Sequence, residues 1–62
     1  EYFKEKGFTE DKYSWMKGEF SLMKSTLGIR MDVFFRGEYF KQITRCVEDV
    51  ESTYLECTGE LL

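Results

Sequence analysis

The sequence predicts an all-α fold, and two observations lead to this prediction. Apolar residues recur at gaps of three and four along 13–27 and 29–57, the spacing that keeps side chains on one face of a helix. Charged and polar residues fill most positions between them, as on the solvated face of an amphipathic helix. We therefore expect helices over about 9–27 and 29–57, within one small domain, or a fragment of one, that spans 1–62.

The first predicted helix begins at Thr9, whose hydroxyl can cap free backbone amides. Glu10 and Asp11 would then lie at the positive end of the helix dipole. Phe8 precedes the cap, and Tyr13 follows it at the spacing of a hydrophobic staple. The apolar face of this helix would consist of Tyr13, Met16, Phe20, Met23 and Leu27.

The second predicted helix has a longer apolar face. Only Arg36 interrupts it, and the aliphatic stem of an arginine can lie along apolar surface. Thr58-Gly59 marks the expected helix end, because glycine readily adopts the left-handed conformation that ends helices. The residues of this face are Ile29, Val33, Arg36, Phe40, Ile43, Val47, Val50, Tyr54 and Cys57.

Gly28 separates the two predicted helices and leaves two arrangements open. A break at Gly28 gives a helical hairpin, or part of an up-down four-helix bundle, in which both apolar faces fold together. The alternative is one long kinked helix, which Met31 and Phe34 favour because they continue the first apolar face. We favour a break, since this chain alone must cover both faces.

The composition argues against several functional classes. The chain has 62 residues, a net charge of −3 and no cluster of basic residues, which argues against nucleic-acid binding. It has no run of about 20 apolar residues, so we expect no membrane span. It also has no histidine, the commonest general base and metal ligand, and no Gly-rich phosphate loop. We therefore expect no catalytic residues, no cofactor, no metal site and no enzymatic activity.

Contact with other proteins is the function that remains. A chain this short buries only ~60% of the surface that its unfolded form exposes, so its own core is thin. Aromatic residues make up 18% of it, which suggests that a partner covers some of them. We predict a non-catalytic structural or interaction subunit of a larger protein assembly. The predicted partner contacts are Tyr2, Phe3, Trp15, Leu22, Phe34 and Phe35.

The two cysteines, Cys46 and Cys57, allow two interpretations. Along an unbroken helix their separation is a rise of ~16 Å, whereas the Cα atoms of a disulfide lie ~4.4–6.8 Å apart. Pairing therefore requires a break in the helix, and it implies an oxidising compartment. Otherwise both cysteines are free, buried thiols.

A motif in the middle of the chain carries a family resemblance. The matching residues are Leu27, Ile29, Arg30 and Asp32, then Glu38, Phe40, Lys41 and Ile43, with Trp15 upstream. In this stretch the chain resembles the PsbQ family, the extrinsic lumenal subunits of photosystem II, which are four-helix bundles. The resemblance implies one uninterrupted helix, a non-catalytic role and a location in the thylakoid lumen, peripheral to a membrane complex.

A second function remains open beside this resemblance. The chain would be a small helical hairpin, secreted or in the intermembrane space, held by a disulfide between Cys46 and Cys57. It would act as a ligand or inhibitor, in an oxidising compartment.

Overall fold

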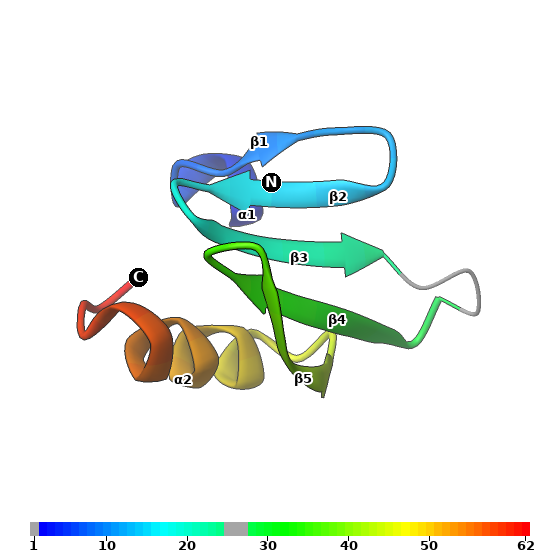
Figure 1. Cartoon of the computed structure of the whole chain (residues 1–62). Helices are drawn as coiled ribbons and strands as arrows, with labels where there is room; N and C mark the ends of the chain where they lie inside the picture. The colour runs from blue at the N-terminus through cyan, green and yellow to red at the C-terminus, as the bar shows by residue number, and fades with distance from the viewer. Residues whose placement is uncertain (1, 25–27) are drawn as a thin grey trace.

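The computed structural model describes residues 2–24 and 28–62, and it shows an α+β fold (Figure 1). Five antiparallel strands form one sheet in the order β1-β2-β3-β4-β5, so each strand pairs with its neighbours in sequence. A short helix precedes the sheet and a helix of 12 residues follows it. The elements are α1 Tyr2–Glu5, β1 Thr9–Glu10, β2 Ser14–Lys17, β3 Phe20–Lys24, β4 Arg30–Phe35, β5 Glu38–Thr44 and α2 Val47–Thr58.

The predicted all-α fold is wrong over most of the chain. Strands occupy the described part of the predicted helix 9–27 and the first half of the predicted helix 29–57. The helical hairpin, the single long helix and the four-helix bundle are all incompatible with this sheet. The apolar residues appeared at helical spacing because residues from both faces of the sheet were counted as one series. Phe20 is completely buried, whereas Met16 and Met23 lie on the opposite face.

A helix does form over the last part of the second predicted helix, from Val47 to Thr58. Its end is also confirmed, because Gly59 has a left-handed backbone with φ of 76° and donates its N–H to the carbonyl of Leu55 at 2.8 Å. Val50 and Tyr54 are buried against the sheet, at the helical spacing that the sequence showed. Periodicity was therefore reliable only where the outer face of the element is polar.

At one end of the sheet, two-residue turns connect β2 to β3 and β4 to β5. Phe35 pairs with Glu38, and the two residues between them, Arg36 and Gly37, have φ of 56° and 81°. Two positive φ values are typical of a type I′ turn, whose twist matches that of a hairpin. Arg36 also joins the two hairpin tips, because its N–H donates to the carbonyl of Glu19 at 3.0 Å and its Nε lies 3.0 Å from the Glu19 carboxylate.

The core lies on one face of the sheet, and both helices pack there. Phe3 of α1 stacks on Trp15 with 4.9 Å between ring centroids, and Tyr54 of α2 contacts Phe20 edge to face at 5.0 Å. In Figure 1, α2 lies below β4 and to the left of the lower end of β5. The buried apolar residues are Phe8, Trp15, Phe20, Leu22, Met31, Val33, Ile43, Val50 and Tyr54.

The type I′ turn can be tested by Gly37→Ala. We expect this substitution to lower the free energy of unfolding by about 1 kcal/mol, because an L-residue is strained at positive φ. A Cβ at this position would meet no atom within 4 Å, so the loss would come from the backbone alone. Urea unfolding measures it, with Glu38→Ala as a control at the adjacent, extended position. Equal stability of Gly37→Ala and the unmodified chain would contradict the assigned turn.

Candidate functional site

The face of the sheet that points away from the helices is the main candidate site. Residues paired directly across antiparallel strands lie on the same face, so the register defines this surface. One row crosses all five strands and consists of Thr9, Met16, Ser21, Phe34 and Tyr39. A second row consists of Ser14, which is buried at one end of it, and of Met23, Asp32 and Gln42. We call these two rows, together with the pair Arg30 and Thr44, the open face.

The open face presents several large apolar side chains to solvent. Met16 is 40% exposed, Met23 37% and Tyr39 58%. The rings of Phe34 and Tyr39 meet edge to face, with centroids 5.6 Å apart. Next to them, the register shift between Val33 and Phe34 leaves Phe40 without a direct partner in β4. This bulge is the kind of irregularity that re-aims side chains at the edge of a sheet.

The lysines of the strands point to the opposite, helix-bearing face. Lys17 pairs with the buried Phe20, and its Nζ donates to the carbonyl of Lys6 at 2.6 Å. Lys41 pairs with the buried Val33, and its Nζ lies 2.9 Å from the Glu56 carboxylate of α2. As a result, Asp32 and Arg30 are the only charged members of the open face.

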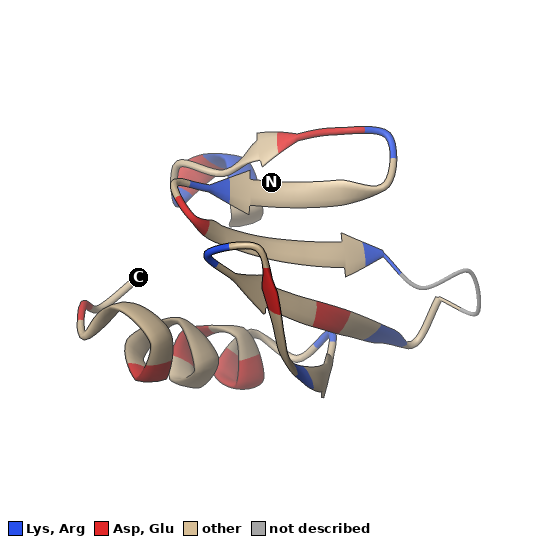
Figure 2. Ribbon diagram, in the orientation of Figure 1, with Lys and Arg blue, Asp and Glu red and all other residues tan. Residues whose placement is uncertain are grey.

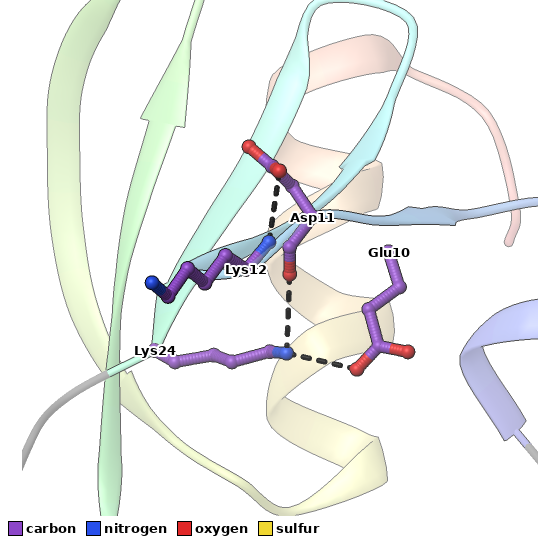
Figure 3. A network of polar contacts seen from close by, with 4 residues as sticks. All are labelled: Glu10, Asp11, Lys12 and Lys24. Atoms are coloured by element: carbon purple, nitrogen blue, oxygen red, sulfur yellow. Dashed lines mark hydrogen bonds and ion pairs between the residues drawn. The ribbon is translucent and has the colours of Figure 1, made fainter.

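Lys24 also belongs to the helix-bearing side, where it forms the polar network of Figure 3. Its Nζ lies 2.9 Å from the Glu10 carboxylate and 4.9 Å from the ring centroid of Trp15. It also donates to the carbonyl of Asp11 at 3.4 Å, and the Asp11 carboxylate accepts the N–H of Lys12 at 2.8 Å. The network holds the loop between β1 and β2 beside the end of β3, and its solvent exposure limits its contribution to stability.

Most of the predicted contact residues serve the chain's own core. Trp15 and Leu22 are buried in it, with 6% and 0% of their surface exposed. Phe3 and Phe35 are partly buried and pack against it. Phe34 is the only predicted contact residue on the open face.

Tyr2, the remaining predicted contact residue, links the two helices. Its hydroxyl donates to the Glu51 carboxylate at 3.1 Å, from α1 to α2. Partial burial, the hydrogen bond to Glu51 and the negative charge of Glu51 together raise the pKa of Tyr2 to about 12, with burial as the largest cause.

Sequence reasoning missed Met16, Met23 and Tyr39 as surface residues, because it assigned the two methionines to the apolar face of a helix and did not single out Tyr39. The available signal was the dipeptide turns Gly18-Glu19 and Arg36-Gly37, which divide the chain into short strands. Once strands are assumed, alternate residues fall on opposite faces.

The two cysteines are free thiols. Cys46 precedes the first residue of α2 and Cys57 lies near its end, so an unbroken helix holds them ~16 Å apart along its axis. The disulfide left open by the sequence, and the disulfide-held hairpin with it, therefore do not form within this fold. Burial raises the pKa of the Cys57 thiol, with a contribution from the negative charge of Glu56 and an opposing one from Lys41.

A polar hollow of about 250 Å³ lies between β5 and the first turns of α2. Two of the residues that line it are hydrogen-bonded to each other: the hydroxyl of Thr44 donates to the Asp49 carboxylate at 2.5 Å. Within residues 2–24 and 28–62, no group of three or more metal-ligating side chains comes together. Among the described helices, none is long and apolar enough to cross a membrane.

Comparisons with protein-family models, curated proteins and solved structures find no match to this chain. Most of the residues that resemble the PsbQ motif lie on strands, Arg30 and Asp32 on β4, Phe40 and Ile43 on β5, whereas Ile29 precedes β4 and Leu27 lies outside the described residues. The uninterrupted helix implied by that resemblance is therefore wrong. The location in the thylakoid lumen stays a prediction.

The hydrogen bond from Tyr2 of α1 to Glu51 of α2 predicts that Tyr2 loses its proton at a higher pH than an ordinary tyrosine. Because the folded pKa of about 12 lies above the ordinary value of 10.0, this group stabilises the fold below pH 10 and the contribution is lost as the pH rises toward 12. We expect Glu51→Gln to move the Tyr2 transition to lower pH. Tyrosinate absorbance, with Tyr2→Phe as the reference that removes this transition, measures the shift. An unchanged transition in Glu51→Gln would contradict the contact.

The free thiols predict two alkylation rates on the folded chain. Cys46 is exposed and should react first with iodoacetamide, whereas the half-buried Cys57 should react more slowly because its raised pKa leaves less thiolate. Mass spectrometry over time resolves the two additions, and Cys46→Ser should retain only the slow one. Failure of both cysteines to react without a reductant would indicate a disulfide and contradict the structure.

Proposed function

We propose that this chain is a non-catalytic protein-interaction module that binds a protein partner with the open face of its sheet. The observation that carries the proposal is the distribution of side chains between the two faces. Lys17, Lys24 and Lys41 turn toward the helices, while methionine and aromatic side chains turn toward solvent.

This distribution reverses the usual one. An antiparallel sheet with one covered face normally presents polar and charged side chains on the other. Single exposed apolar residues need no explanation, but the row from Met16 through Ser21 to Phe34 and Tyr39 continues across four adjacent strands. A contiguous apolar surface of this kind, with polar residues around it, is typical of interaction sites.

The residue types also suit a protein surface better than a small ligand. Methionine adapts to irregular partner surfaces, and tyrosine combines a large apolar ring with a hydroxyl that can bond at the rim. Ser21, Thr9 and Gln42 add short hydrogen-bonding groups between the apolar side chains. The surface is an open sheet with no residue pattern for acid–base chemistry.

The proposal keeps the role of a subunit in a larger assembly and names no particular complex. The photosystem assignment gains no support, because most of the residues behind it are strand residues whose spacing only resembled a helical motif. The partner is defined by chemistry, as a protein surface that is mainly apolar and close to neutral.

A photoreactive phenylalanine at Tyr39 tests this function in the cells that make the protein. We expect a covalent adduct with one protein of defined mass, because Tyr39 is 58% exposed at the end of the open face. The matched control places the same amino acid at Leu55, which is 44% exposed on α2, and should give no such adduct. Equal adducts at both positions, or none at Tyr39, would contradict binding through the open face.

A further inference from the structure

We propose that the partner on the open face is a second copy of this chain, packed face to face about a two-fold axis parallel to β3. This inference rests on the proposed function and adds the identity of the partner and the geometry of the contact. Two observations support it, the charge distribution and the order of residues in the central row, and the extent of the sheet sets the expected strength of the dimer.

The charge distribution favours the open face over α2 as the surface on which two copies meet. The acidic residues of α2 are Glu48, Asp49, Glu51 and Glu56, and the helix has no Lys or Arg (Figure 2). Two copies that met through α2 would bring eight carboxylates together, four from each helix. The open face instead carries one Asp and one Arg, and no net charge.

Face-to-face packing also separates the acidic helices. Because α2 lies on the other side of the sheet, the two α2 helices would be on the outside of the dimer. Because packed layers lie ~10 Å apart, the axes of the two helices would be roughly 30 Å apart. This is well beyond the Debye length of ~8 Å at physiological ionic strength, so the two helices would hardly repel each other. The neutral face and the acidic helix thus favour the same arrangement.

The central row is suited to a two-fold axis along β3, the middle strand of the five. Such an axis places Ser21 opposite Ser21 of the second copy, where the small side chain lets the sheets approach. It places Met16 of β2 opposite Phe34 of β4 in the second copy, and the reverse. Contacts between methionine sulfur and aromatic rings are favourable, so the row complements itself when it is reversed.

The size of the sheet indicates a weak dimer. Five strands ~4.8 Å apart, each with about five residues of ~3.4 Å rise, cover roughly 400 Å² in projection, or about 800 Å² for two copies. Stable complexes bury ~1,200–2,000 Å² in total, so this interface falls in the transient class. We expect dissociation at concentrations of tens of micromolar and association toward ~1 mM.

Charge exchange at Ser21 tests the dimer and its axis together. Sedimentation velocity is measured from ~10 µM to ~1 mM for the unmodified chain, for Ser21→Glu, for Ser21→Lys and for an equimolar mixture of the two variants. We expect concentration-dependent dimers of the unmodified chain and monomers of each variant, since like charges would face each other. The mixture should dimerise again, because Glu and Lys then meet at the axis.

A second pair of variants protects the test against misfolding at Ser21. Tyr39→Glu, at an exposed position, should weaken the dimer at least tenfold, whereas Leu55→Glu on α2 should leave it unchanged. Circular dichroism confirms that each variant is folded.

Each possible result distinguishes this inference from the proposed function. An unmodified chain that stays monomeric at every concentration would overturn the second copy, and an adduct of Tyr39 with a different protein would still support the open face as a binding surface. A dimer that Ser21→Glu and Ser21→Lys leave intact would overturn the proposed axis. A dimer weakened by Leu55→Glu and not by Tyr39→Glu would place the contact on α2 and overturn both proposals.

Discussion

A continuous series of aromatic contacts on one face of the sheet holds the described elements together. Phe3 touches both Trp15 and Phe8, Phe8 meets Phe20, and Phe20 meets Tyr54, with centroids between 4.9 and 6.2 Å apart. These rings connect α1, β2 and β3 with α2, which is far from them in sequence. In so short a chain only one such layer can be filled, because the buried fraction of the surface is small. Both helices are therefore committed to the same face, and the other is left without cover.

The electrostatics of the fold follow from this one-sided core. Carboxylates gather on α2 and at the end of β1, and two of the strand lysines turn toward them. Lys41 reaches Glu56 of α2, and Lys24 reaches Glu10. Each ion pair is exposed and contributes little by itself. More important is the resulting distribution of charged side chains: the lysines lie on the helix-bearing face, so the opposite face of the sheet is almost without charge.

The same distribution explains how much of the structure could be predicted from sequence. Helix α2 and its end at Gly59 were predictable because Val50 and Tyr54 face the core while acidic residues face solvent. The strands were not, because their outer face is apolar as well. Trp15-Met16 and Phe34-Phe35 each place one large apolar residue on either face, which hides the alternation that identifies a half-buried strand. The glycines of the two-residue turns, Gly18 and Gly37, are visible in the sequence, but both fall inside the predicted helices.

The candidate site was even less accessible from sequence. Phe34 was identified from its aromatic side chain, but its neighbours Met16 and Tyr39 adjoin this surface only through the register of four strands. That register depends on two-residue turns and on the bulge at Phe40, and moving it by one residue would exchange the two faces. The residue types alone could indicate that the chain exposes apolar side chains. Only the pairing of the strands indicates which of these side chains form one surface.

The sequential order of the strands has a kinetic consequence. Every strand pairs with the one before it in the chain, so each hairpin closes a short loop before any distant segment has to arrive. Proteins built from such local pairings cross a lower entropic barrier than sheets with crossovers. We therefore expect the meander to form the folding nucleus and the two terminal helices to dock on it afterwards.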